Sequence, residues 1–441
     1  MSVKSSRIQV TPLLGGKSDG GVCSLLEIGG SRILLDCGCT TVADYPILLK
    51  LVDELASNGG LDAVLISHAD IHHIGALPCL LGRQGLQDVP IICTLPVFKF
   101  GQIVLYDYFL NQKMEGADQF NNFDVDDIDV AFSKIQTVKF SQTTTVTQSQ
   151  LSNNSRAPEI TVCALPSGRT IGGSIWRIRC GPAEILYTMD INLKKEVVLD
   201  GASLDLLPTG PALMVVEGAT SQTTKKTKKD KDESSQLIAT VMETVRNGGN
   251  CLLPTETGGR LLELMQLLGK HWLDNKLGNY HLIVLSHMAH NIPEFGRMQL
   301  EWMSDGLSRG FYNGKPNPFD LPQISFVTSV KEVERKFLGP KVVLATDASL
   351  SCGLSKELLL KWGGDPRCCV LFTDGSQAGS LAAELRSKAS APPIIATVSK
   401  PFKVELVGEE LAEYRLEAER IRKEREEAIL RKRRQEELTQ V

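Results

Sequence analysis

The stretch from Leu65 to Pro78, Leu-Ile-Ser-His-Ala-Asp-Ile-His-His-Ile-Gly-Ala-Leu-Pro, constrains the fold of this chain more than any other part. It contains His68, His72 and His73, three of the seven histidines of the chain. It follows the apolar run from Ala63 to Ile66, which is too short for a helix and predicts a buried strand. Because loops at the carboxyl ends of strands carry the chemistry of many α/β folds, we expect a functional loop here.

The clustered His and Asp side chains of this loop have two interpretations. At spacings of two to five residues, the imidazole nitrogens and the Asp70 carboxylate can surround one Zn²⁺ in tetrahedral geometry. In the alternative, the cluster caps a helix, and its polar groups bond only to nearby backbone. The residue types alone leave both interpretations open.

The loop resembles the signature motif of the metallo-β-lactamase superfamily, His-x-His-x-Asp-His. The Gly-Ala-Leu-Pro that follows is similar to the sequence at this place in the nucleic-acid-processing β-CASP branch of that superfamily. His68 stands at the first histidine of the motif and His73 at the last. Asp70 stands where the second histidine belongs, and His72 where the aspartate belongs. Two of the four signature positions therefore depart from the family pattern.

Three acidic residues match further motifs of the family. Asp36, in Ile-Leu-Leu-Asp-Cys-Gly, matches the first motif, an acidic residue at a strand end that orients the site. Asp190 matches the fourth motif, whose carboxylate bridges two metals in active members. Glu217 matches the acidic residue that opens the β-CASP cassette. The resemblance implies that these three side chains frame the site.

Arg169 stands where the third motif requires a histidine. Arginine has no lone pair to give and stays protonated at physiological pH. At about 4 Å from a divalent ion, a guanidinium repels it by roughly 8 kcal/mol at an effective dielectric constant of about 20. We therefore expect no catalytic residue and no metal at the degenerate positions, which are Asp36, His68, Asp70, His72, His73, Arg169, Asp190 and Glu217.

The Arg169 guanidinium can take over the electrostatic role of the missing metal. Buried acids without a counter-charge are costly, so an ion pair with one of them would stabilise the site. The candidate partners are Asp36, Asp70 and Asp190. In the alternative, Arg169 points to solvent.

Length and patterning predict an α/β protein, because 441 residues with 42% hydrophobic content suffice for two or three cores, and strands alternate with helices. Together with the resemblance, this implies a metallo-β-lactamase αββα sandwich whose N-terminal part spans residues 1–208. A β-CASP α/β domain is expected to be inserted over residues 209–395. A return segment and a charged helix occupy 396–441. In the family, the histidines of the last two motifs and the strands that complete the first domain lie beyond a point that corresponds to Val441, so we expect this chain either to be a fragment or to have lost them.

Local patterns predict particular elements within these domains. Two apolar runs around Gly29-Gly30 predict a β-hairpin from Val22 to Cys37, and a Gln/Ser/Thr-rich composition predicts a loop from Ser141 to Ser155. The cassette is expected to begin with a strand from Ala212 to Glu217. Apolar runs between Cys251 and Thr373 predict a second, parallel sheet.

Charge and cysteine usage limit the partners and the compartment. The formal net charge of −4 indicates no global basic field, so any RNA contact would depend on local patches. The basic run from Arg431 to Arg434 resembles a short nuclear localisation signal. The eleven scattered cysteines predict reduced thiols in an intracellular protein. No segment approaches the roughly 18 apolar residues that a membrane span requires. The weak candidates for RNA binding are Lys225, Lys226, Lys228 and Lys229, although a solvated linker is the commoner fate of such a run.

The resemblance implies a non-catalytic scaffold, a pseudo-nuclease without cofactor, in the nuclear machinery of mRNA 3′-end processing. Its expected partners are the active β-CASP endonuclease, the scaffold subunits of the cleavage and polyadenylation machinery, and pre-mRNA, contacted directly or through them. The alternative is a zinc-dependent RNA endonuclease in which His72, His73 and Asp190 hold one Zn²⁺ and Glu217 assists. Three ligands plus water are a legitimate catalytic zinc set.

Overall fold

The computed structural model describes residues 8–16, 20–57, 60–81, 86, 88–116, 120–146, 159–218, 233–389, 396–399, 407–417, 419–420 and 423. Residues up to Thr397 form one compact unit, and those from Val398 onward form a second. In the second unit, residues 409–417 are helical, in agreement with the predicted charged helix. The basic runs at 225–229 and 431–434 lie outside the described residues. No helix in the described ranges is both long and apolar enough to cross a membrane.

The first domain contains two sheets. The first sheet has the strand order β1-β2-β3-β4-β5-β6. Its strands are β1 (Ile8–Leu14), β2 (Cys23–Ile28), β3 (Ser31–Leu35), β4 (Ala63–Leu65), β5 (Ile91–Thr94) and β6 (Ile135–Val138). The second sheet has the order β11-β10-β9-β8-β7. Its strands are β7 (Thr143–Val146), β8 (Ile160–Pro166), β9 (Ser174–Cys180), β10 (Ala183–Thr188) and β11 (Leu213–Val216).

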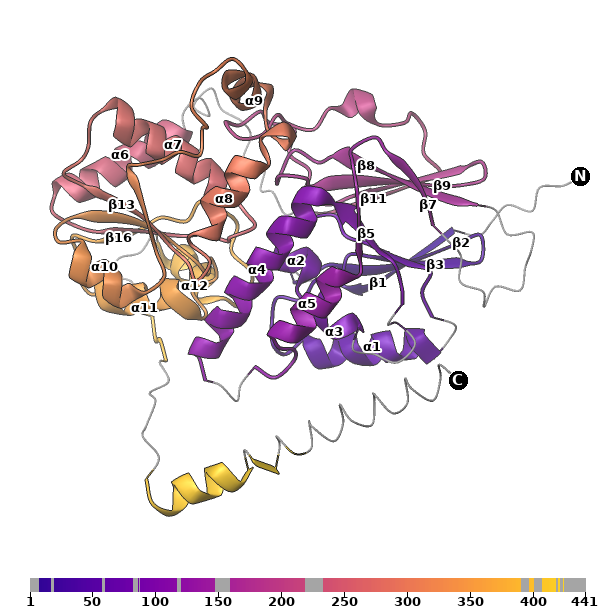
Figure 1. The fold of residues 1–441 in the computed structure, drawn as a ribbon, viewed down its shortest axis with the longest axis horizontal. Coiled ribbons are helices and arrows are strands. Elements are labelled where there is room, and N and C mark those ends of the chain that lie inside the picture. The colour runs from indigo at the N-terminus through magenta and orange to yellow at the C-terminus, as the bar shows by residue number, and fades with distance from the viewer. Residues whose placement is uncertain are drawn as a thin grey trace, which may run out of the picture. The chain divides into compact units, whose positions relative to one another are not determined.

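Alternation of side chains along the strands produces the layers of this domain. In β3, Ile33 and Leu35 pack toward the second sheet, whereas Leu34 belongs to the core under the helices. The helices on that face are α1 (Tyr45–Ser57), α3 (Leu77–Leu81), α4 (Leu95–Met114) and α5 (Val125–Ser133), as Figure 1 shows. Helix, sheet and sheet are three layers of the predicted sandwich.

One element predicted from the sequence is confirmed, and two are corrected. The hairpin from Val22 to Cys37 is confirmed as β2 and β3, which pair antiparallel. The predicted loop from Ser141 to Ser155 includes β7, where three threonines and a valine, all β-branched, form an edge strand beside β8. The strand assigned to the cassette, β11, pairs in parallel with β10 and extends the first domain's sheet instead.

The second domain is built on the predicted parallel sheet, with the order β14-β13-β15-β12-β16. Its strands are β12 (Cys251–Pro254), β13 (His281–Leu285), β14 (Ile324–Val327), β15 (Lys341–Ala345) and β16 (Cys369–Val370). One face packs on α6 (Glu233–Arg246), α7 (Leu261–Asp274) and α8 (Asn291–Met298). The other face packs on α10 (Val330–Lys336), α11 (Gly353–Trp362) and α12 (Leu381–Lys388). The shorter elements are η1 (Leu204–Leu206), η2 (Leu300–Trp302) and α9 (Asp305–Tyr312).

Helix α4 joins the two domains through a buried carboxylate. Asp107 accepts hydrogen bonds from the Thr257 hydroxyl at 2.9 Å, the Ser286 hydroxyl at 2.7 Å and the His287 backbone N–H at 2.9 Å. These three donors follow β12 and β13, at the carboxyl edge of the parallel sheet. A side chain of the first domain therefore accepts hydrogen bonds from donors that lie beyond the ends of two strands of the second domain.

Candidate functional site

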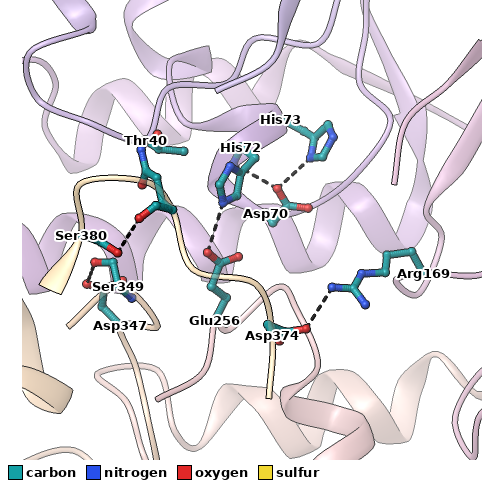
Figure 2. Close-up of polar contacts among 11 residues, drawn as sticks. Thr40, Asp70, His72, His73, Arg169, Glu256, Asp347, Ser349, Asp374 and Ser380 are labelled. Atoms are coloured by element: carbon teal, nitrogen blue, oxygen red, sulfur yellow. Dashed lines mark hydrogen bonds and ion pairs between the residues drawn. The ribbon is translucent and has the colours of Figure 1, made fainter. Parts of the chain in front are cut away.

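The histidine loop follows β4, as predicted, and leads into the short helix α2 (Ile71–Ile74). Asp70 is the N-cap of this helix, and its Oδ1 accepts a hydrogen bond from the His72 backbone N–H at 3.0 Å. The same oxygen lies 2.7 Å from Nδ1 of His73 (Figure 2). The capping interpretation is therefore confirmed for Asp70, and the carboxylate also contacts a histidine of the motif.

Close backbone contacts hold the loop against the residue that precedes β2 and against the segment after β3. The Val22 N–H donates to the carbonyl oxygen of His72 at 2.7 Å, and the Cys37 N–H donates to that of His73 at 2.8 Å. A Cβ on Gly38 would lie 1.5 Å from the His72 carbonyl oxygen, so this approach requires glycine. Backbone contacts thus help to position the loop.

Asp36 lies at the end of β3 in the left-handed region, with φ of 57°. Its carboxylate accepts hydrogen bonds from the Ser67 N–H at 2.6 Å, the Ser67 hydroxyl at 2.7 Å and the Tyr187 hydroxyl at 2.8 Å. Burial raises the pKa of Asp36, although His73 and these donors act in the opposite direction. These three hydrogen bonds hold Asp36 in its strained left-handed conformation, which fixes the position of its carboxylate.

His68 is fully buried, and both of its ring nitrogens have hydrogen-bond partners. Nδ1 lies 2.9 Å from the Ser67 hydroxyl, and Nε2 lies 2.9 Å from the Ser167 hydroxyl. Burial lowers the pKa of His68 to about 4, so the ring is neutral at physiological pH. Its nitrogen lone pair is engaged by a hydroxyl group.

Asp70, His73 and Asp190 offer ligand atoms within 4.8 Å of one another, the one such group of three in the part of the chain that the structure describes. Burial opposes the charge on His73, but Asp70 outweighs it and raises the pKa of His73 to about 10. Nε2 of His73 is buried without a hydrogen-bond partner. The Asp190 backbone N–H donates to Oε2 of Glu217 at 3.1 Å, which places the fourth-motif and cassette acids side by side.

His72 points away from this group. Its Nε2 lies 3.4 Å from Oε1 of Glu256, a residue that follows β12 of the second domain (Figure 2). Both side chains are about 30% exposed, and Glu256 raises the pKa of His72 to about 9 against the effect of burial. The ligand set His72, His73 and Asp190 is therefore not the one brought together, because Asp70 takes the place of His72.

Arg169 is directed to the second domain. Its Nη2 lies 3.0 Å from Oδ1 of Asp374, and the two side chains are 32% and 20% exposed. The prediction that Arg169 forms an ion pair with Asp36, Asp70 or Asp190 was therefore wrong, because its partner is Asp374. Burial disfavours the charged guanidinium, but Asp374 first and then Asp190 and Asp70 outweigh it and raise the pKa of Arg169. The positive charge thus acts on the acids of the candidate metal group without bonding to them.

The sequence interpretation missed Ser67, Ser167 and Tyr187 of the first domain, which contact Asp36 and His68, and three residues of the second domain. The three of the second domain are Glu256 and Asp374, which Figure 2 shows, and Gln377, whose Nε2 donates to the Thr40 hydroxyl at 2.6 Å. Glu256 and Asp374 follow β12 and β16, at the carboxyl edge of the parallel sheet. That edge is where α/β folds place binding groups, which is the signal that identifies them.

Two family models match this chain. The metallo-beta-lactamase superfamily domain matches residues 25–217, and the Beta-Casp domain matches residues 261–385. The first match includes β11, in agreement with its pairing to β10. The chain therefore belongs to the β-CASP branch of the metallo-β-lactamase superfamily.

Within this class, the chain is similar to cleavage and polyadenylation specificity factor subunit 2. The probable subunit 2 of Drosophila melanogaster is 36% identical over 413 residues, which are 93% of this chain and 52% of that protein. Subunit 2 of Oryza sativa is 34% identical over 95% of this chain and 54% of that protein. Endoribonuclease YSH1 of Eremothecium gossypii is 27% identical over 84% of this chain and 47% of that protein. The chain spans about half the length of these relatives.

Proposed function

We propose that this chain is a non-catalytic subunit of the nuclear machinery that processes mRNA 3′ ends. The relatives at 34% and 36% identity are named as subunits of a cleavage and polyadenylation factor, which supports the process. The loss of catalysis rests on Arg169, which stands at the third-motif position and whose positive charge acts on Asp190 and Asp70, two of the three remaining metal-binding candidates.

The zinc that the family implies is poorly matched by these residues. His68 is engaged by two serine hydroxyls, and His72 is engaged by Glu256. A site with two metal ions is therefore short of nitrogen ligands. One ion at Asp70, His73 and Asp190 would keep three ligands, but it would be held beside the fixed positive charge of Arg169.

The proposed role is structural. The chain pairs with the active β-CASP endonuclease, joins the scaffold subunits of the machinery, and helps to hold the pre-mRNA. The ion pairs Arg169–Asp374 and His72–Glu256 support this role, because they connect the two domains with residues that would otherwise serve a metal centre.

Cleavage assays on a reconstituted pair of this chain and an active β-CASP endonuclease test the proposal. RNA cleavage should be unchanged when His73→Ala or Asp190→Ala is introduced into this chain. The matched control changes a metal-binding histidine of the endonuclease, and it should abolish cleavage. A loss of cleavage with the His73 or Asp190 variant, while the two proteins still copurify, would contradict a non-catalytic role.

A zinc-dependent RNA endonuclease is the second candidate. The convergence of Asp70, His73 and Asp190 favours it. In this ligand set, Asp70 replaces His72, which the sequence analysis had assigned as the third ligand. It predicts RNA cleavage by the isolated chain that a chelator abolishes and added zinc restores. The non-catalytic proposal predicts no such activity in the isolated chain.

A further inference from the structure

Two cysteines face each other across the edge of the parallel sheet. Cys251 of β12 is the direct partner of Cys369 of β16, and their sulfur atoms lie 3.3 Å apart. Neighbouring strands run about 4.8 Å apart, which is within the Cα separations that disulfides span. Cys251 is buried, whereas Cys369 is partly exposed on the edge strand. The pair therefore needs little movement to become bonded.

The surroundings of the two sulfurs favour thiol chemistry over metal binding. The Thr244 hydroxyl of α6 donates to the Cys369 sulfur at 3.1 Å. The third cysteine nearby, Cys368, accepts a hydrogen bond from the Asn250 N–H at 3.3 Å, and adjacent residues of a strand point to opposite faces. These cysteines do not form a group of three metal ligands in the part of the chain described.

We propose that Cys369 and Cys251 form a reversible disulfide when the protein meets a peroxide, with Cys369 as the attacking sulfur and Cys251 as the resolving one. The contact with the Cys251 sulfur and the hydrogen bond from the Thr244 hydroxyl support this order, because they outweigh burial and lower the pKa of Cys369 to about 7. The same contact and burial raise the pKa of Cys251.

The reaction balances in two steps with hydrogen peroxide. The Cys369 thiolate attacks one peroxide oxygen, the O–O bond breaks, and the other oxygen leaves as water after taking up a proton. Cys369 is then a sulfenic acid. The Cys251 sulfur attacks the Cys369 sulfur, the S–O bond breaks, and the hydroxyl leaves as a second water with the thiol proton of Cys251. Two thiols and one peroxide give one disulfide and two waters.

The disulfide would act on the segment that connects the domains. β16 is a two-residue strand, and five residues after Cys369 the chain reaches Asp374, the partner of Arg169. A covalent bond between β12 and β16 would fix the start of that segment. Oxidation is therefore expected to reinforce the Arg169–Asp374 contact.

Peptide mapping of the whole chain tests the proposal. The reduced protein is treated with a small excess of hydrogen peroxide, blocked with N-ethylmaleimide, digested and measured by mass spectrometry. We expect a linked pair of peptides containing Cys251 and Cys369 that dithiothreitol separates. Without peroxide, N-ethylmaleimide should label Cys369 roughly tenfold faster than Cys93, a buried thiol whose pKa burial raises.

Variants identify the sulfurs. Cys368→Ser should keep the linked peptides, and Cys369→Ser should remove them. Cys251→Ala should leave Cys369 to oxidise further, to the sulfinic acid, and Thr244→Val should slow the labelling of Cys369. Circular dichroism verifies that each variant is folded. Linkage of Cys251 through Cys368, or Cys369 oxidised while Cys251 stays free in the unaltered chain, would overturn the proposal.

Discussion

At the scale of single residues, the proposed non-catalytic role depends most on the Arg169–Asp374 ion pair. In a double-mutant cycle of Arg169→Ala and Asp374→Ala, we expect a coupling energy of about 1 kcal/mol, because both side chains are partly shielded from water. Chemical denaturation measures it. The coupling should decrease in high salt.

The more exposed pair Arg297–Asp320 is the matched control for this cycle. Its side chains are 37% and 52% exposed, so its coupling should be about 0.5 kcal/mol or less. Equal coupling in the two pairs, or none between Arg169 and Asp374, would show that the interdomain pair contributes no more than a surface contact.

His287 gives a pH-dependent prediction. Burial lowers the pKa of His287, so the folded chain binds fewer protons than the unfolded chain as the pH falls through the ordinary histidine range. The free energy of unfolding should therefore decrease below about pH 6.5. In His287→Gln, this decrease should be smaller, which denaturation at several pH values measures. The exposed His290→Gln is the control, and a pH dependence in His287→Gln equal to that of the unaltered chain would contradict the account.

The motif residues could be placed from the sequence, but their contacts could not. Asp70, His73 and Asp190 come together because the loop after β4 of the first sheet meets the residues after β10 of the second sheet, which the family pattern encodes. The acids Asp374 and Glu256 reach the site only through the packing of the second domain. No spacing along the chain reports that packing.

At the scale of elements, α4 is held to the parallel sheet by Asp107. Asp107→Ala would leave the donors of Thr257, Ser286 and His287 buried without their acceptor. We expect a loss of roughly 3 kcal/mol in the free energy of unfolding, measured by urea denaturation. Asp126→Ala, on the exposed face of α5, is the control and should change it by about 0.5 kcal/mol or less. Similar losses in the two variants would refute this role for Asp107.

The elements themselves were predictable to different degrees. Buried strands such as β12 and β15 have continuous apolar runs, so their positions and their parallel arrangement followed from alternation with helices. The edge strands β7 and β11 were misassigned, because polar threonines resemble a loop and a strand's partner is set by tertiary contacts. Edge strands carry the weakest signal of this kind.

At the scale of the whole molecule, contacts that connect the domains converge around the histidine loop. His72 and Arg169 contact the second domain through Glu256 and Asp374 (Figure 2), and Thr40 contacts it through Gln377. In this account, side chains of an ancestral catalytic site now stabilise the association of two domains. The account thus requires that the site bind no stoichiometric zinc.

Zinc content by mass spectrometry, on protein purified without a metal-affinity tag, tests that requirement most directly. We expect roughly a tenth of an equivalent of zinc or less, because the guanidinium opposes a dication beside Asp70, His73 and Asp190. The His73→Ala variant should contain the same trace amount. About one equivalent of zinc in the unaltered chain, lost in His73→Ala, would contradict the account and favour the single-metal endonuclease.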